Sequence, residues 1–156
     1  MRIGNILSLV FFIALSLSAG FIGSFATAGS IETWYTTLTQ PSWTPPNWIF
    51  GPVWTTLYVL MGTAAYLVSR SKGVRKVFTL WFFVAHLVVN TLWSIVFFGL
   101  HELLLAVLVI VLLDVLILIL IRLFWKHSHI AAYLLLPYLA WCLYATSLSI
   151  GLLVLN

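Results

Sequence analysis

Residues 103–124, LLLAVLVIVLLDVLILILIRLF, form the most apolar stretch of the chain, and only Asp114 and Arg122 interrupt it with a charged side chain. About 20 such residues are enough to cross the roughly 30 Å hydrocarbon core of a bilayer as an α-helix. The whole chain has the same character, because 63% of its 156 residues are hydrophobic and only 6% are charged. A soluble domain carries about 25% charged residues. We therefore expect an integral membrane protein.

Four further apolar stretches predict four further membrane helices. Together the five predicted spans cover residues 4–28, 47–69, 77–100, 103–124 and 130–155. Their continuous Leu, Val and Phe runs differ from the alternating segments of a membrane β-barrel. We therefore expect an all-α membrane protein, a five transmembrane helix bundle that forms one integral membrane domain over residues 1–156. The first span ends in Ala26-Thr27-Ala28, which also fits a signal-peptide cleavage site, but the apolar run is longer than such peptides have.

The distribution of charge predicts the topology. If five helices alternate in direction, all seven Lys and Arg residues fall on one side of the membrane, in the N-terminus and in the loops at 70–76 and 122–129. Glu32 and Glu102 fall on the other side. Because cytoplasmic loops are enriched in cations, we expect a cytoplasmic N-terminus and an outer C-terminus. A multi-pass protein of the bacterial plasma membrane fits best, an organelle membrane stays open, and these scattered cations do not predict a nucleic-acid partner.

The connection between the first two predicted helices is rich in tryptophan and proline. Four of the eight tryptophans and four of the five prolines lie between Trp34 and Trp54, around the sequence PSWTPPNW at 41–48. Aromatic residues gather at membrane interfaces, which accounts for Trp48. Proline also restricts the residue before it to extended backbone, so the segment is stiff. Two interpretations stay open: an interfacial aromatic belt, and a structured outer loop that covers a pocket.

Helical spacing places aromatic and polar residues on one face of three predicted helices. The three sets are His86, Asn90, Trp93 and Phe97; Trp54, Tyr58 and Met61; and Pro137, Trp141, Ala145 and Leu148. Because Asn and His seldom face lipid, we expect these faces to point inward. Spacing alone favours ordinary helix packing, with Asn90 bonded to a neighbouring helix, over a ligand pocket.

The acidic, histidine and cysteine residues of the predicted helices carry separate expectations. Asp114 should be protonated or hydrogen-bonded to another helix, because an ionised acid is costly in the membrane. We expect His86 to be a packed polar residue rather than a haem ligand. The remaining His and Cys residues lack metal-site spacing, so no metal is expected. The predicted helix at 103–124 is almost entirely Leu, Val and Ile apart from Asp114, so we expect it to face lipid.

The first predicted helix carries small residues at every fourth position. They form two offset rows, namely Ser16, Gly20 and Ser24, and Ala19, Gly23 and Thr27. Small residues allow membrane helices to approach closely. The rows therefore predict a packing face, either within one chain or between two copies.

Three blocks of the sequence resemble the translocator protein family, whose members are also called tryptophan-rich sensory proteins or peripheral-type benzodiazepine receptors. The first block contains Trp34-Tyr35, Pro41-x-Trp43-x-Pro45-Pro46 and Phe50-x-x-Val53-Trp54-x-x-Leu57-Tyr58-x-x-Met61-Gly62. The others are Asn90-x-x-Trp93-Ser94-x-x-Phe97-Phe98 and Pro137-Tyr138-x-x-Trp141-x-x-Tyr144-Ala145. The blocks occur in the family's order, from residue 34 to residue 145.

The resemblance implies a bundle whose inward faces line a ligand pocket beneath the first loop. Carried over by position, the pocket residues are Tyr35, Pro45, Trp54, Asn90, Trp93, Trp141 and Ala145. The implied ligand is a porphyrin such as protoporphyrin IX, no cofactor is required, and a homodimer is expected. The function implied is that of a receptor, sensor or carrier.

Two alternatives remain at this stage. Bacterial family members are linked to light-dependent porphyrin breakdown, so an enzyme with Trp54 and Trp141 as photochemical residues is the first. A membrane scaffold that binds no ligand is the second. Animal members carry a Tyr-to-Arg sterol motif at the end of the last helix, and residues 145–156 have neither Tyr nor a cation. Sterol binding is therefore not expected, although Leu60, Tyr66 and Arg70 fit a loose sterol pattern.

Overall fold

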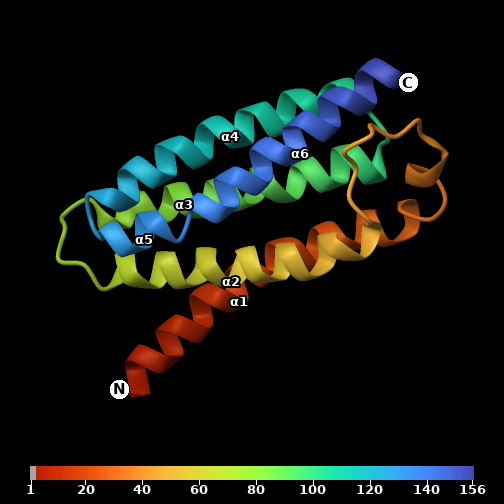
Figure 1. Cartoon of the computed structure of the whole chain (residues 1–156). Helices are drawn as coiled ribbons and strands as arrows, with labels where there is room; N and C mark the ends of the chain where they lie inside the picture. Colours follow the sequence, from red (N-terminus) through yellow and green to blue (C-terminus); the bar gives the residue numbers. More distant parts are fainter. Residues whose placement is uncertain (1–2) are drawn as a thin grey trace.

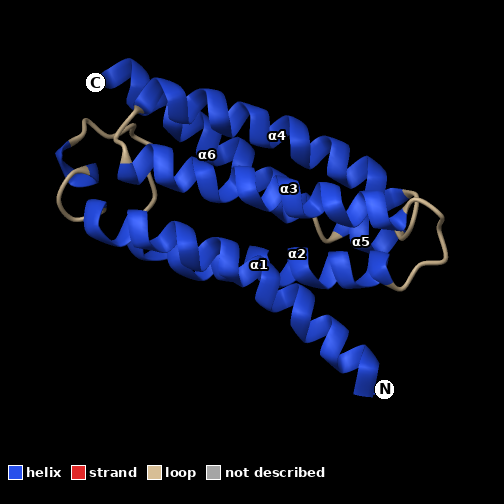
Figure 2. Ribbon diagram, turned by 180° about the vertical axis from the view of Figure 1, so that it is seen from behind, coloured by secondary structure: helices blue, strands red, loops and turns tan. Residues whose placement is uncertain are grey.

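The computed structural model describes residues 3–156, and all regular secondary structure within that range is helical (Figures 1 and 2). The long helices are α1 (Ile3–Ser30), α2 (Phe50–Ser69), α3 (Lys76–Ser94), α4 (Leu103–Trp125) and α6 (Leu136–Leu155). Shorter elements are the 3₁₀ turns η1 (Tyr35–Thr37) and η2 (Asn47–Ile49), the π-helix η3 (Ile95–Gly99), and α5 (His129–Tyr133). The all-helical expectation is confirmed.

Within residues 3–156, four segments are long and apolar enough to cross a membrane by length and composition. They are Gly4–Ser30, Lys76–Gly99, Leu103–Trp125 and His129–Leu155. The remaining long helix, α2, has 20 residues, but Gly, Thr, Trp and Tyr dilute its aliphatic content. It runs beside α1 along the bundle (Figure 1), and its side chains Met61, Ala64 and Ala65 are fully buried.

The last predicted span is broken in the structure. Residues 130–155 were expected as one helix, but α5 ends at Tyr133 and α6 begins at Leu136. The reason is Pro137 in the first turn of α6, since proline lacks the N–H and clashes with a preceding helical turn. Ser128 caps α5, with its hydroxyl oxygen accepting from the Ala131 N–H at 3.2 Å.

The third predicted span also has a local irregularity. Its last five residues, Ile95–Gly99, form the π-helix η3, which continues directly from α3. A π-helix contains one extra residue per turn, so it rotates the side chains that follow it around the helix axis. Phe97 and Phe98 both lie in this turn, and His101 after it adopts a positive φ of 59°.

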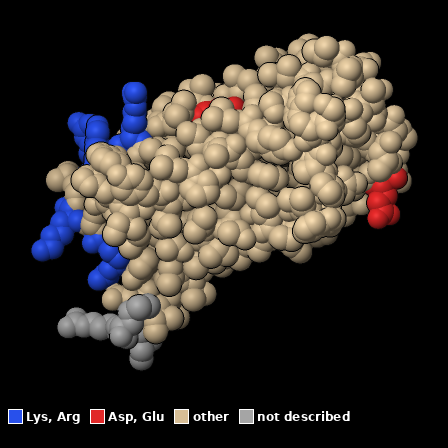
Figure 3. Space-filling model, in the orientation of Figure 1, with Lys and Arg blue, Asp and Glu red and all other residues tan. Residues whose placement is uncertain are grey.

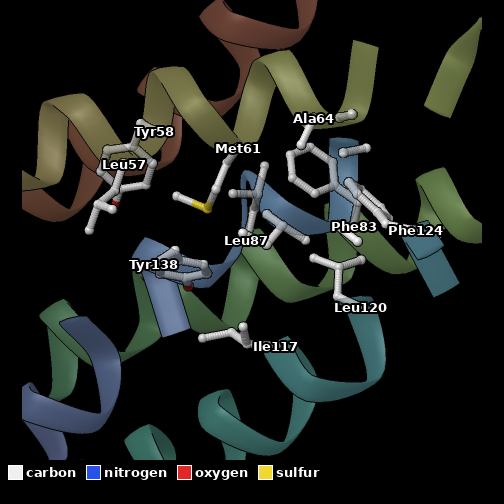
Figure 4. Close-up of a cluster of buried hydrophobic side chains, with 14 of the residues drawn as sticks. Leu57, Tyr58, Met61, Ala64, Phe83, Leu87, Ile117, Leu120, Phe124 and Tyr138 are labelled. Atoms are coloured by element: carbon white, nitrogen blue, oxygen red, sulfur yellow. The ribbon is translucent and has the colours of Figure 1, made fainter. Parts of the chain in front are cut away.

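The helices form two layers that enclose a common core. Helices α1 and α2 lie side by side, and α3, α4 and α6 form the facing layer (Figures 1 and 2). Met61 of α2, Phe83 of α3, and Leu120 and Phe124 of α4 meet between them and are fully buried (Figure 4). Because lipid is as apolar as these side chains, van der Waals packing stabilises such contacts more than exclusion of water does.

The small residues of α1 and α2 lie where the two helices approach most closely. A Cβ atom on Gly62 would lie 2.5 Å from the Ile13 Cα, and one on Gly20 would overlap the Tyr58 ring. Ser16 is fully buried. The small-residue rows of α1 therefore pack within one chain, and a homodimer stays a prediction.

Helix α4 differs from the lipid-facing wall that its composition predicted. One of its faces is exposed, but Leu113, Ile117 and Leu120 on the other are fully buried against α3 and α6. Leucine and isoleucine suit lipid and a packed interior equally, so composition does not distinguish the two. Asp114 lies at the α6 side, where the Thr146 hydroxyl donates to its Oδ2 at 2.7 Å. The expected bond to a neighbouring helix is confirmed.

Candidate ligand pocket

A cavity of about 480 Å³ lies between the two layers, at the end of the bundle that carries the Trp/Pro loop. Helices α1, α2, α3 and α6 line it, together with Tyr35 and Asn47 from the loop. Small-molecule sites have volumes of about 300–1,000 Å³ and mostly apolar walls with a few polar groups. The cavity therefore has the size and chemistry of a ligand site.

Small residues of α1 line one side of the cavity, namely Gly20, Gly23 and Ser24. The Tyr58 ring of α2 packs directly against Gly20, where a Cβ atom would overlap it. Gly23 also lies close to α3, because a Cβ atom there would be 3.1 Å from the Ser94 hydroxyl. The small residues therefore set how closely α1 approaches α2 and α3 beside the cavity.

Aromatic rings form the opposite wall. Trp54 of α2 stacks on Tyr58 with 5.7 Å between ring centroids, and it lies 6.4 Å from Trp93 of α3. Trp93 in turn stacks on Phe97 at 5.6 Å. All four rings line the cavity. Such faces provide flat, polarizable contact area for a flat apolar ligand.

A chain of hydrogen bonds lies behind this wall. The Tyr58 hydroxyl donates to Asn90 Oδ1 at 2.6 Å, and Asn90 Nδ2 donates to the Tyr138 oxygen at 3.0 Å. The Tyr138 hydroxyl also pairs with His86 Nε2 at 2.8 Å. Asn90 therefore holds the Tyr58 ring in place from outside the cavity, and His86 is a packed polar residue, as expected.

The Trp/Pro loop is attached to α6 by polar and apolar contacts. The Asn156 side chain accepts from the Thr39 N–H at 2.8 Å and donates to the Thr39 carbonyl at 3.1 Å. The Tyr144 hydroxyl donates to the Trp43 carbonyl at 2.7 Å. Pro41 lies against Gly151, where a Cβ atom would be 2.7 Å from the proline Cγ. The loop is therefore held in a defined position along α6, from Tyr144 to the C-terminal end of the helix.

Tyr35 is a buried residue of the loop that lines the cavity. Its side chain is only 5% exposed and packs on Phe97 and Phe98, with centroids 6.1 and 5.9 Å away. Burial, reinforced by the nearby Tyr144, raises the pKa of Tyr35 to about 12. The phenol therefore keeps its proton at neutral and moderately alkaline pH.

The structure brings four of the seven expected pocket residues to the cavity surface, namely Tyr35, Trp54, Trp93 and Ala145. The other three, Pro45, Asn90 and Trp141, do not line it. Trp141 packs instead against Phe50 and Tyr144, with centroids 6.0 and 5.5 Å away, and its indole N–H is buried without a partner. Pro137, expected on the same inward face, is exposed.

Sequence reasoning missed the contribution of α1 to the pocket. Leu17, Gly20, Gly23 and Ser24 form one wall, and the rows of small residues were the only signal available for them. Within residues 3–156, no cluster of His, Cys, Asp and Glu could hold a metal ion. The lining itself offers aromatic rings, small residues and a few polar groups.

The fold and the cavity define a class: a multi-pass helical membrane protein with a largely apolar cavity between its helices. The profile of the TspO/MBR family matches residues 12–155. The chain is 43% identical to the tryptophan-rich protein TspO of Archaeoglobus fulgidus, over 97% of this chain and 99% of the relative. It is 38% identical to protein CrtK of Rhodobacter capsulatus, over 94% and 91% of the two chains.

Animal proteins are also similar to this chain. The human translocator protein is 37% identical to it, over 83% of this chain and 78% of the human protein. The chain therefore belongs to the TspO/MBR family, and the resemblance inferred from its Trp/Pro loop and aromatic helix faces is confirmed.

Proposed function

We propose that this protein is a membrane receptor, sensor or carrier that binds porphyrins, of which protoporphyrin IX is the type, and other flat apolar molecules in the 480 Å³ cavity. The observation that carries the proposal is the empty space between the α1 small residues and the Trp54–Trp93 wall. A scaffold without a ligand would be expected to fill such a space with side chains, because protein interiors are closely packed.

The two walls have complementary roles in this proposal. Leu17, Phe21 and Ser24 of α1 contact one face of a macrocycle, while Trp54 and Trp93 contact its opposite face or edge. Tyr35 supplies a neutral hydroxyl near the mouth, suited to a carbonyl or carboxylate of the ligand. The loop tether through Asn156 then keeps Tyr35 over the bound molecule.

We further propose an orientation with the basic end of the bundle in the cytoplasm of a bacterial cell and the loop outside. The Lys and Arg side chains of the described residues gather at one end of the molecule (Figure 3). Arg2, which belongs to the same predicted side, lies outside the described residues. A homodimer in the plasma membrane completes the proposal, and the exposed faces of α1 and α4 leave room for one.

The test is a titration of the purified protein with protoporphyrin IX in the dark, followed by tryptophan fluorescence. Trp54→Phe and Trp93→Phe should each weaken binding by about 3- to 10-fold, as expected for loss of an aromatic contact worth about 0.5–1.5 kcal/mol. Trp48→Phe is the matched control, since Trp48 is 74% exposed and outside the cavity. Unchanged affinity in both pocket variants would contradict the assignment.

The same titration under illumination separates the receptor from the photochemical enzyme. A receptor or carrier leaves the porphyrin absorption spectrum intact beyond the bleaching seen without protein. A protein-dependent loss of the spectrum that Trp54→Phe or Trp141→Phe abolishes would instead indicate degradation. Absence of any fluorescence quenching in the dark would refute both.

A further inference from the structure

A second cavity, of about 230 Å³, lies between the beginning of α3 and the end of α4. Two cations, Arg75 and Lys126, line it together with the apolar side chains of Val74, Phe78 and Leu123. The large cavity lies near the other end of α3, next to the Trp/Pro loop, and no residue of α4 lines it. The second cavity is therefore a separate site, which we call the basic groove.

The floor of the groove is already engaged in hydrogen bonds. His127 Nε2 pairs with the Thr79 hydroxyl at 3.2 Å, and His127 Nδ1 pairs with the Ser71 hydroxyl at 3.1 Å. These bonds connect the loop after α2, the first turn of α3 and the end of α4. Arg75 and Lys126 are both exposed, and neither side chain has an ion-pair or hydrogen-bond partner among residues 3–156. The groove thus presents two cations without a counter-charge, and the hydrogen bonds of His127 hold its backbone segments together.

No acidic residue of the chain lies near this end. Glu32 follows α1, Glu102 precedes α4 at its opposite end, and Asp114 lies in the middle of α4. Figure 3 accordingly shows the Lys and Arg atoms at one end and the acidic atoms away from it. An anion that enters the groove therefore meets attraction without a competing carboxylate.

The surface next to the groove is apolar and unpartnered. Val74, Phe78 and Trp81 are 99%, 60% and 69% exposed, and they continue from the groove along α3 toward the middle of the bundle. A small soluble anion would use the cations but leave this surface without contact. A lipid satisfies both, because its headgroup is charged and its acyl chains cover apolar helix surface. Basic pockets between membrane helices are typical sites for anionic headgroups.

We propose that the basic groove binds the phosphodiester headgroup of an anionic membrane lipid, with Arg75 and Lys126 on the phosphate and the acyl chains along Phe78 and Trp81. The groove then anchors the bundle to the leaflet on its basic side. This proposal does not depend on the ligand of the large cavity.

The experiment measures retained lipid by native mass spectrometry of the full chain in non-ionic detergent. Phosphatidylglycerol and phosphatidylcholine with identical acyl chains are titrated in parallel. In the double variant Arg75→Gln/Lys126→Gln, the affinity for phosphatidylglycerol should fall by about 10-fold or more. The matched control is Arg70→Gln/Lys72→Gln, which removes the same charge from the same end but leaves the groove intact. The control should retain most of the affinity.

Three outcomes would overturn the proposal. Equal losses in the two double variants would show diffuse surface electrostatics rather than a site. Equal binding of phosphatidylcholine would show that the charge is not recognised. Displacement of the lipid by an equimolar amount of inorganic phosphate would assign the groove to a soluble anion. Arg75→Gln alone, at an exposed position, provides a second variant if the double variant folds poorly, and it should show an intermediate loss.

Discussion

Replacement of Gly62 by alanine should separate α1 from α2. The added Cβ would lie 2.5 Å from the Ile13 Cα and 2.7 Å from the Phe12 carbonyl oxygen, whereas ordinary contacts begin at 3.4 Å. Both neighbours are backbone atoms and cannot rotate away, so α1 must move by about 1 Å as a body. Overpacking of this kind costs about 1–3 kcal/mol.

The assay is thermal unfolding of the purified protein in detergent, with Gly51→Ala as the matched control. Gly51 lies in the same helix, but a Cβ atom there would meet nothing within 4 Å. Gly51→Ala should be neutral, or stabilising by up to about 1 kcal/mol, because alanine loses less backbone entropy than glycine in a helix. Gly62→Ala should unfold several degrees below it. If the two variants had equal melting temperatures, the close helix contact at Gly62 would be refuted.

Three further predictions concern the attachment of the Trp/Pro loop, the loss of stability at alkaline pH, and the buried hydrogen bonds of Asn90. Asn156→Ala should increase hydrogen exchange at the Thr39 amide and speed porphyrin release several-fold, because two hydrogen bonds worth about 0.5–1.5 kcal/mol each are lost. Unchanged exchange at Thr39 would contradict the attachment of the loop to Asn156. The folded protein holds the Tyr35 proton more tightly than the unfolded chain, with a pKa of about 12 against 10.0, so this contribution to stability is complete below pH 10 and is lost as the pH rises through about 12. The melting temperature of Tyr35→Phe should therefore fall less steeply between pH 10 and 12 than that of the unmodified protein. Parallel curves for the two proteins would argue against the burial of this hydroxyl. Asn90→Ala should lower the free energy of unfolding by about 1–3 kcal/mol, because the Tyr58 and Tyr138 hydroxyls lose a buried partner. Trp54→Phe, measured by the same thermal assay, should lower it less. A smaller loss for Asn90→Ala than for Trp54→Phe would argue against a supporting role of Asn90 behind the cavity wall.

Much of the fold follows from local properties of the chain. Continuous apolar runs place the long helices within a few residues of their observed ends, because a membrane span needs a certain length and all backbone groups must bond internally. Helical periodicity likewise predicted that His86, Asn90, Trp93 and Phe97 share a face, and all four are buried. The break before α6 was missed, although Pro137 was visible in the sequence, because the flanking residues are as apolar as a continuous span.

The residues of the candidate site could be predicted only in part from helical periodicity. Periodicity tells which residues share a face, but it does not tell which helix that face meets. Asn90 and Trp93 therefore looked equivalent, yet Trp93 lines the cavity while Asn90 bonds Tyr58 and Tyr138 behind it. The sequence likewise could not decide which helix or cavity the small residues of α1 face, because small residues allow close packing against any partner.

The sequence by itself determined the membrane class, the helical architecture, the family and the gathering of cations at one end, because these depend on composition, on length and on the order of short motifs. Only the tertiary structure decided that Gly20 and Gly23 line a cavity, that Asn90 supports its wall, and that the Trp/Pro loop is attached to α6. The physical reason is distance along the chain: Thr39 and Asn156 are 117 positions apart, and their hydrogen bonds exist only once the helices have packed.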